Sequence, residues 1–223
     1  MNYYSKSLNA NRLQRCYEVA PLRIQQLLKA EIDFVLRKLS INDIVLELGC
    51  GYGRVAIELA GKSKKVFGID ISSDNIELAK NLYHEVNNLQ FTQMNAIELD
   101  FPADTFDMTI CIQNGISAFK EDPYLLLTEA LRVTKKGGII LFSSYSNKIW
   151  EERLHWFQIQ ADEKLLGEID YDQTKDGIIV CKDGFRATTY SENDFLELAS
   201  KCNVDATIYE VDNSSIFCEI KKE

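Results

Sequence analysis

Residues 45–54 read VLELGCGYGR, an apolar run followed by glycine at every second position. Glycine is costly there unless the backbone must turn tightly or let another group approach closely. The flanking segments predict a buried strand over 44–48 (IVLEL) and a helix over 54–60 (RVAIELA). A strand, a glycine-rich turn and a helix start together predict a ligand site at the carboxyl edge of a sheet, where the helix N-terminus favours a negative group.

Strands and helices alternate through the rest of the chain. Further strands are expected at 65–70, 88–94, 106–112, 139–144, 207–211 and 216–220, with short strands inside 168–190. Helices are expected over 21–39, 123–136 and 147–165, and two more are expected to begin near Ser73 and after Ser191. The cap of the helix near Ser73 is Ser73 itself or Asp74, with Glu77 completing a capping box from Asp74, and Ser191 with Asp194 opens the last helix. Asp122 caps the helix over 123–136, and Gly137-Gly138 end it. The alternation predicts an α/β fold with a parallel sheet and helices on both faces. Because four residues join the last two strands, they must form an antiparallel hairpin. We therefore expect a seven-stranded, mostly parallel sheet with one reversed strand.

Composition narrows the class of protein. The chain has 223 residues, of which 46% are hydrophobic, and this suits one globular domain. A formal net charge of −9 and the lack of a long basic stripe argue against a nucleic-acid partner. Without a long apolar run or a signal peptide, we expect a cytoplasmic protein with no membrane partner. The six cysteines form no CxxC pair and only two histidines are present, so we expect reduced thiols and no metal site.

The glycine turn itself admits more than one ligand. Gly49, Gly51 and Gly53 depart from the dinucleotide spacing G-x-G-x-x-G, and the phosphate loop G-x-x-x-x-G-K-[ST] is absent. Asp70 ends the second predicted strand, where a carboxylate can accept hydrogen bonds from both hydroxyls of a ribose. A nucleoside cofactor is therefore expected. A nicotinamide-dependent oxidoreductase remains an alternative, against which the glycine spacing and the terminal hairpin both speak.

Four stretches together resemble the class I S-adenosylmethionine-dependent methyltransferases: VLELGCGYGR, VFGID, FDMTICIQN and LRVTKKGGIILFSS. The resemblance covers roughly residues 43–145 and 190–221. It implies a Rossmann-like fold and the cofactor S-adenosyl-L-methionine, which leaves as S-adenosyl-L-homocysteine. The cofactor-binding residues that it implies are Glu47, Gly49, Gly51, Gly53, Arg54, Asp70, Ile71, Asn95, Ala96, Gln113 and Asn114.

The resemblance also assigns roles within this set. Glu47 would lie near the amino group of the cofactor, Asp70 would hold the ribose, and Ile71 would pack on the adenine. Asn95 stands where many members have an aspartate for the adenine amino group. Gln113 and Asn114 would lie beside the sulfonium and the methyl acceptor.

Methyl transfer from a sulfonium is an in-line displacement that needs no metal and no enzyme nucleophile, so the protein mainly aligns the reactants. We expect a single domain over 1–223, with a helical cap at 1–40 and an acceptor-side insertion at 146–190. Aromatic residues in both segments indicate a small-molecule acceptor, first of all an amine nitrogen. Tyr145 and His155 are candidates for a general base, and Arg23 for a carboxylate contact.

Three questions stay open at this point. The same fold can methylate a protein or an RNA, or can bind the cofactor without catalysis. The chain can be a monomer or a homodimer. Residues 1–20, which include Tyr3, Tyr4 and Tyr17, are expected to become ordered when cofactor binds, because such sites need a mobile cover.

Overall fold

Seven strands form one sheet in the computed structural model of this chain, which describes residues 10–223. The strand order is β3-β2-β1-β4-β5-β9-β8, and β9 runs antiparallel to both of its neighbours while the other pairs are parallel. The prediction of a mostly parallel sheet with one reversed strand is therefore confirmed. The strands are β1 (Ile44–Leu48), β2 (Lys65–Asp70), β3 (Leu89–Gln93), β4 (Phe106–Cys111), β5 (Thr134–Tyr145), β8 (Ala206–Val211) and β9 (Ser215–Lys221).

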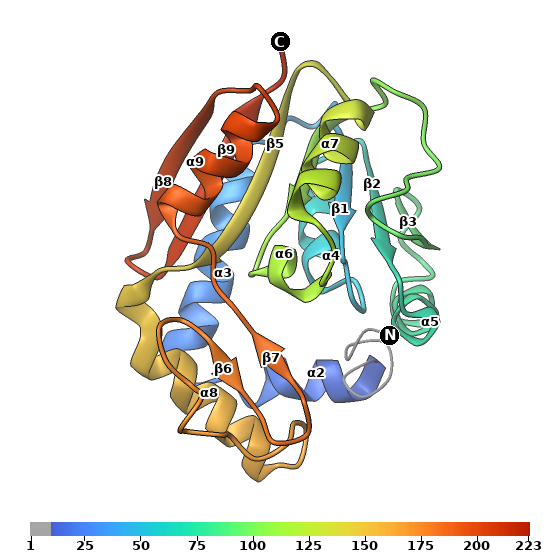
Figure 1. The fold of residues 1–223 in the computed structure, drawn as a ribbon. Helices are drawn as coiled ribbons and strands as arrows, with labels where there is room; N and C mark the ends of the chain where they lie inside the picture. Colours follow the sequence, from blue (N-terminus) through green and yellow to red (C-terminus); the bar gives the residue numbers. More distant parts are fainter. Residues whose placement is uncertain (1–9) are drawn as a thin grey trace.

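Helices cover both faces of this sheet (Figure 1). One face packs on α3 (Leu22–Lys38), α4 (Arg54–Ala60) and α5 (Ser73–Leu82). The other packs on α6 (Gly115–Ala118), α7 (Pro123–Val133) and α9 (Glu192–Lys201). Because β1 and β4 are covered on both sides, almost all of their side chains are buried, which explains their continuous apolar sequences.

A third layer lies beyond the carboxyl ends of the strands and combines two distant parts of the sequence (Figure 1). It consists of α2 (Ala10–Glu18), the 3-10 helix η1 (Asn147–Ile149), α8 (Trp150–Asp162) and the short antiparallel pair β6 (Ile179–Val180) and β7 (Arg186–Ala187). Their apolar side chains share one core with the first turns of α3. We call this layer the cap.

Two helix ends follow the expected chemistry and one does not. Asp122 caps α7, and Ser191 with Asp194 forms the capping box of α9, as predicted. The cap of α5 is instead Ser72, whose side chain accepts from the backbone N–H of Asn75. The expectation of a cap at Ser73 or Asp74 was wrong by one residue or two, because any of these side chains could supply the acceptor oxygen.

The junction of α7 and β5 also differs from the prediction. The helix ends at Val133 and β5 begins at Thr134, so Lys135 and Lys136 lie in the strand. Gly137 has a φ of 77°, and the pairing of β4 with β5 shifts register here. The two glycines mark a strand irregularity and not the end of the helix.

All six cysteines are free thiols, and every one except Cys202 is buried, consistent with their use as small apolar residues. Among residues 10–223, no helix combines the length and the apolar composition that crossing a membrane requires.

Candidate functional site

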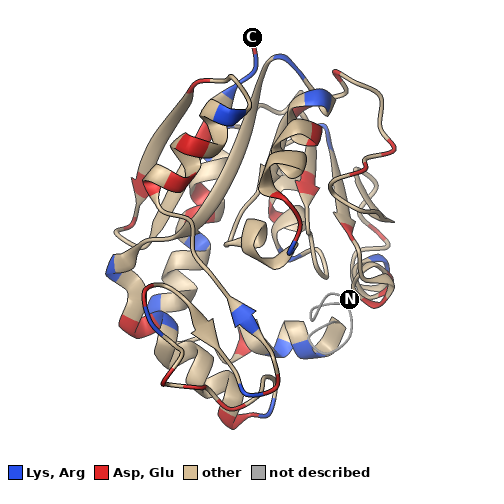
Figure 2. Cartoon of the chain, viewed as in Figure 1, with Lys and Arg blue, Asp and Glu red and all other residues tan. Residues whose placement is uncertain are grey.

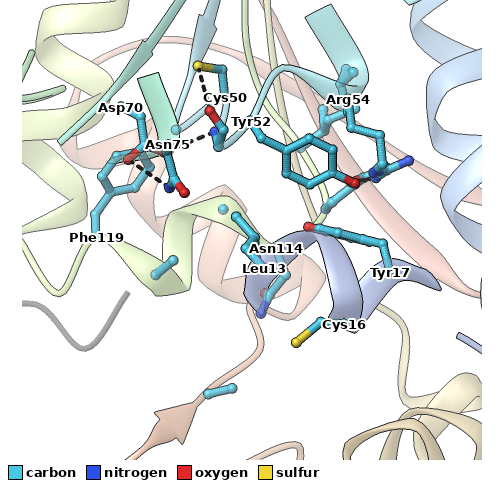
Figure 3. Close-up of a pocket in the computed structure, with 18 of the residues that line it drawn as sticks. Leu13, Cys16, Tyr17, Cys50, Tyr52, Arg54, Asp70, Asn75, Asn114 and Phe119 are labelled. Atoms are coloured by element: carbon cyan, nitrogen blue, oxygen red, sulfur yellow. Dashed lines mark hydrogen bonds between the residues drawn. The ribbon is translucent and has the colours of Figure 1, made fainter. Parts of the chain in front are cut away.

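A cavity lies at the carboxyl ends of β1, β2 and β4, between the sheet and the cap. Its sheet side comes from the glycine turn, the end of β2 and the turn after β4, and its cap side comes from α2, α8 and β7 (Figure 3). The residues that line it include Leu13, Cys16, Tyr17, Glu47, Gly49, Gly51, Tyr52, Arg54, Asp70, Ile71, Asn75, Gln113, Asn114, Phe119, Tyr145, Trp156, Phe157, Gln160, Phe185 and Ala187.

The glycine turn needs its glycines for two different reasons. All three have φ values in the left-handed region: 72° at Gly49, 53° at Gly51 and 87° at Gly53. Gly49 and Gly51 line the cavity. A Cβ on Gly53 would instead lie 2.5 Å from the ring of Phe91, so this glycine permits close packing of the turn behind the cavity.

Asp70 fixes the turn from the end of β2. Its Oδ2 accepts from the backbone N–H of Gly51 at 2.9 Å, and its Oδ1 accepts from Ser72 N at 2.8 Å and Asn75 Nδ2 at 3.3 Å. Burial raises the pKa of this carboxyl, and the three hydrogen bonds oppose that rise. A carboxylate has about four acceptor positions, so Asp70 retains capacity toward the cavity.

Glu47, on β1, is buried with a carboxyl oxygen left over. Its exposed fraction is 4%, and its Oε2 has no hydrogen-bond partner among the described residues. Burial raises the pKa of this carboxyl to about 8, against the attraction of Arg54. An unsatisfied buried acceptor is destabilising, so the position suits a cationic donor from a ligand.

Arg54 begins α4 and lies at the opposite end of the cavity from Asp70 (Figure 3). Its guanidinium carbon is 4.3 Å from the ring centroid of Tyr17, and one of its terminal nitrogens donates to Gln113 Oε1. Its Nε is buried and has no hydrogen-bond partner in the described part of the chain. Glu47 and Arg54 thus offer one unused acceptor and one unused donor.

The turn after β4 places two non-glycine residues in left-handed conformations, with φ values of 57° at Gln113 and 62° at Asn114. The Asn114 side chain donates to Thr188 O at 2.9 Å and Ser117 Oγ at 2.8 Å, and accepts from Ser144 Oγ at 2.7 Å. Most of its hydrogen-bonding capacity is therefore used to join this turn to β5 and to the chain that leaves the cap.

Comparison with known proteins finds methyltransferases. A methyltransferase domain family matches residues 45–138. The chain is similar to a fatty-acid O-methyltransferase of Mycolicibacterium smegmatis, with 33% identity over 49% of this chain and 41% of that protein. It is also similar to a ubiquinone biosynthesis O-methyltransferase of Colwellia psychrerythraea, with 28% identity over 70% of this chain and 66% of that protein. The chain thus spans less than two thirds of these curated relatives.

Among solved structures, an S-adenosylmethionine-dependent methyltransferase of Methanosarcina mazei matches 85% of this chain and 96% of its own, with a TM-score of 0.63 and 21% identity. At that identity the likeness concerns the fold, and it agrees with the strand order and the reversed β9. Residues 45–138 thus match a methyltransferase domain, and the findings together support a class I S-adenosylmethionine-dependent methyltransferase.

The residues present fit the cofactor of this methyltransferase family. The methionine part of S-adenosylmethionine carries an ammonium and a carboxylate, which match the unused Oε2 of Glu47 and the unused Nε of Arg54. Asp70 can accept from ribose hydroxyls. Ile71 lines the cavity with 42% of its surface exposed and so offers an apolar surface for the adenine.

Not every residue expected at the cofactor faces the cavity. Gly53, Asn95 and Ala96 are absent from its lining in the described structure. Ala96 is 2% exposed and packs in the core under α7, while the Asn95 side chain accepts from the backbone N–H of Ile97. The adenine contacts expected of this loop remain predictions.

The two candidates for a general base differ in their position relative to the cavity. His155 is exposed on α8 and does not line the cavity, so the structure gives its candidacy no support. Tyr145 does line it, 7% exposed, with the guanidinium of Arg153 4.6 Å from its ring centroid. Arg23, named as a candidate for a ligand carboxylate, instead pairs with Asp212 in the turn between β8 and β9. Tyr3 and Tyr4 lie outside the described residues.

Sequence reasoning missed several residues of the site. Asn75 and Phe119 line the cavity, and neither belongs to a recognised motif. Glu31 lies behind the turn after β4. A signal for it was available, because a glutamate that continues the apolar stripe of Leu28, Ile32 and Val35 must be buried.

Proposed function

We propose that the chain transfers a methyl group from S-adenosylmethionine to a small, apolar acceptor. The observation that supports this most is a single cavity in which Glu47, Arg54 and Asp70 on the sheet side face aromatic side chains of the cap. A protein that only bound the cofactor would have no need for a second apolar wall beside it.

The bound cofactor supplies an electrophilic methyl group on a sulfonium. The work of the chain is alignment, which can contribute ~7–11 kcal/mol to lowering a barrier. Glu47 and Arg54 bind the two charged ends of the amino-acid part, and Asp70 binds the ribose. The cap excludes water and presses the acceptor toward the turn after β4.

Charges around the cavity bear on the acceptor. Within the lining, the carboxylates are Glu47 and Asp70, both on the cofactor side. The guanidinium groups of Arg54 and Arg153 already lie on the rings of Tyr17 and Tyr145. A further cation at these two rings would be repelled by the guanidinium groups already there. A neutral or anionic acceptor fits better, and we propose an oxygen acceptor ahead of an amine.

The amine nitrogen expected from the aromatic residues stays a prediction that nothing yet confirms. Both curated relatives, the fatty-acid O-methyltransferase and the ubiquinone biosynthesis O-methyltransferase, are named for O-methylation. The charges speak against a nucleic-acid partner, because the net charge is −9 and Lys and Arg positions alternate along the ribbon with Asp and Glu positions (Figure 2).

The test is release of S-adenosylhomocysteine with matched acceptors that share an apolar body and differ in one group. Naphthol with naphthylamine, and a long-chain fatty acid with the corresponding alkylamine, are suitable pairs. We expect turnover with the hydroxyl or carboxyl member. Turnover with the amines alone would show that the acceptor atom is nitrogen and not oxygen. Tight cofactor binding with no turnover on a broad set would favour a non-catalytic cofactor-binding protein.

A further inference from the structure

Glu31 is a fully buried carboxylate on α3, with an exposed fraction of 0%. It does not line the cavity but lies directly behind it. Its Oε2 accepts from the backbone N–H of Gln113 at 2.7 Å and from Ser143 Oγ at 2.8 Å, and its Oε1 accepts from Ser215 Oγ at 2.5 Å. It therefore joins α3 to the carboxyl ends of β4 and β5 and to the start of β9.

Burying a carboxylate is costly unless its oxygens are well satisfied. All three donors here are uncharged, and no ion pair with Glu31 is present among the described residues. A well-packed apolar residue at this point of the helix stripe would avoid the cost. The use of a carboxylate here indicates that the hydrogen bonds to the turn after β4 have a role beyond packing.

What it holds is a strained turn. Gln113 and Asn114 both have positive φ, and left-handed conformations of non-glycine residues persist only where the surroundings impose them. The Gln113 N–H is fixed by Glu31 and also by Ser143 Oγ at 2.8 Å. The carboxylate of α3 is thus one of two acceptors that impose this conformation.

The turn after β4 also positions the Gln113 side chain, which faces the cavity. Gln113 lines the cavity, its Nε2 donates to Leu28 O at 3.3 Å, and its Oε1 accepts from the guanidinium of Arg54. A displaced Gln113 would release Arg54 from its place at the cavity. The chain of contacts runs from Glu31 through the backbone of Gln113 to the Arg54 side chain.

We propose that Glu31 is a positioning residue: its carboxylate sets the turn after β4 and thereby aims Gln113 and Arg54 at the ligands. The inference rests on the proposed function for its catalytic consequence, because the turn would border the reacting groups. Its structural part concerns the protein alone and can be tested without an acceptor.

The test compares Glu31→Leu, Glu31→Gln and Ser215→Ala with the wild type. Glutamine can keep its oxygen on Gln113 and Ser143 and turn its amide toward Ser215 Oγ, which accepts as well as donates. Leucine fills the space and removes the acceptors. Ser215→Ala is the matched control, because Ser215 bonds the other oxygen of Glu31 and its bond does not involve the turn.

Two quantities are measured on the full chain: the exchange rate of the Gln113 amide proton by NMR, and the affinity for S-adenosylhomocysteine by calorimetry. We expect Glu31→Leu to speed exchange of the Gln113 amide proton about tenfold or more, because a hydrogen bond to a charged group is lost. We expect the same variant to lower the affinity for S-adenosylhomocysteine by about tenfold or more. We expect Glu31→Gln and Ser215→Ala to stay within about threefold of the wild type in both. Exchange of the Leu46 amide, in the buried centre of β1, reports whether the fold itself has loosened.

Unchanged Gln113 exchange in Glu31→Leu would overturn the proposal, and so would an equal loss in Glu31→Gln. Should Glu31→Leu fail to fold, Ser143→Ala removes the second acceptor of the same N–H and makes Gln113 depend on Glu31 alone. Glu31→Gln on that background must then speed Gln113 exchange more than it does alone. A wild type that does not bind the nucleoside would contradict the proposed function, while the exchange measurement would still decide on Glu31.

Discussion

In the proposed site, Glu47 would make the binding of the cofactor depend on pH. Burial raises the pKa of its carboxyl to about 8 from an ordinary value near 4.5. The neutral form is favoured in the folded protein, so the stability that this group contributes is fully present below pH 4.5 and is lost as pH rises through about 8. An ammonium bound at Oε2 needs the ionised form, and binding must therefore release a proton.

We predict that affinity for S-adenosylmethionine rises between pH 6 and pH 8, as deprotonated Glu47 becomes available. It should fall at higher pH because an α-amino group titrates near pH 7.7–8.0 and loses its charge. Calorimetry in two buffers of different ionisation enthalpy measures the proton released. Glu47→Gln should weaken binding and flatten the rise below pH 8; a rise that survives in this variant would assign it to another group.

A second prediction at the residue scale concerns His155. Because its side chain is exposed and does not line the cavity, His155→Ala should leave kcat and KM within about twofold of the wild type. Steady-state kinetics with any acceptor found in the screen measures this. A drop of a hundredfold in kcat would show that α8 rotates during the reaction.

At the scale of elements, the turn between β1 and α4 depends on glycine for both conformation and space. Gly53→Ala adds a Cβ 2.5 Å from Phe91 and 3.0 Å from Tyr83, at a φ of 87°. Gly137 has a similar φ of 77°, but nothing lies within 4 Å of a Cβ added there, so Gly137→Ala is the matched control.

We predict that Gly137→Ala lowers the free energy of unfolding by about 1–2 kcal/mol, the cost of a left-handed side chain. Gly53→Ala should lower it by a further ~1–3 kcal/mol, the usual cost of overpacking. Urea denaturation at fixed pH compares the two. Equal losses would mean that Phe91 moves aside freely and that the packing at Gly53 is loose.

The elements also show how far the sequence carries a prediction. Strand and helix order, the caps at Asp122 and Ser191, and the terminal hairpin follow from apolar periodicity and cap chemistry, which are local signals. The start of β5 at Thr134 does not, because it is decided by pairing with β4 across the sheet. The charged residues and glycines of the segment 134–138 are typical of a helix end. The segment is a strand because it pairs with β4.

In the whole molecule, the cap joins two segments that are far apart in the sequence, α2 and the segment from η1 to β7. Trp156 of α8 is 5% exposed, and its Nε1 donates to Cys16 O of α2 at 2.9 Å. Arg12 donates to Lys164 O at 2.7 Å and Leu165 O at 2.9 Å. The cap side of the cavity is thus built by α2 and α8 together.

We predict that Trp156→Ala lowers the free energy of unfolding by about 3–5 kcal/mol through loss of a buried aromatic side chain. Trp156→Phe, which keeps a ring and loses the hydrogen bond, should cost only about 1 kcal/mol beyond its smaller volume. Both are measured by urea denaturation. An unfolding curve with a separate early transition in Trp156→Ala would show that the cap unfolds on its own.

The site, at this scale, was predictable where one motif carries several residues and not where distant segments meet. Glu47, Gly49, Gly51, Arg54, Asp70 and Ile71 follow from two strand ends, and Gln113 and Asn114 from a third. Leu13, Trp156 and Phe185 reach the cavity through packing of the cap, which no local pattern encodes. The exposure of His155 could not be predicted either, because the side of α8 that faces the cavity depends on that same packing.

The central claim is that the glycine turn and Asp70 form a site for S-adenosylmethionine. Thermal unfolding with S-adenosylmethionine, S-adenosylhomocysteine, NAD or buffer, on the wild type, Asp70→Ala and the exposed control Asp74→Ala, tests it most directly. A ligand at a hundredfold excess over Kd stabilises the fold by ~2.7 kcal/mol. We predict a rise in Tm with the two sulfur nucleosides for the wild type and Asp74→Ala, and its loss in Asp70→Ala. A rise with NAD alone, or one that persists in Asp70→Ala, would contradict the account.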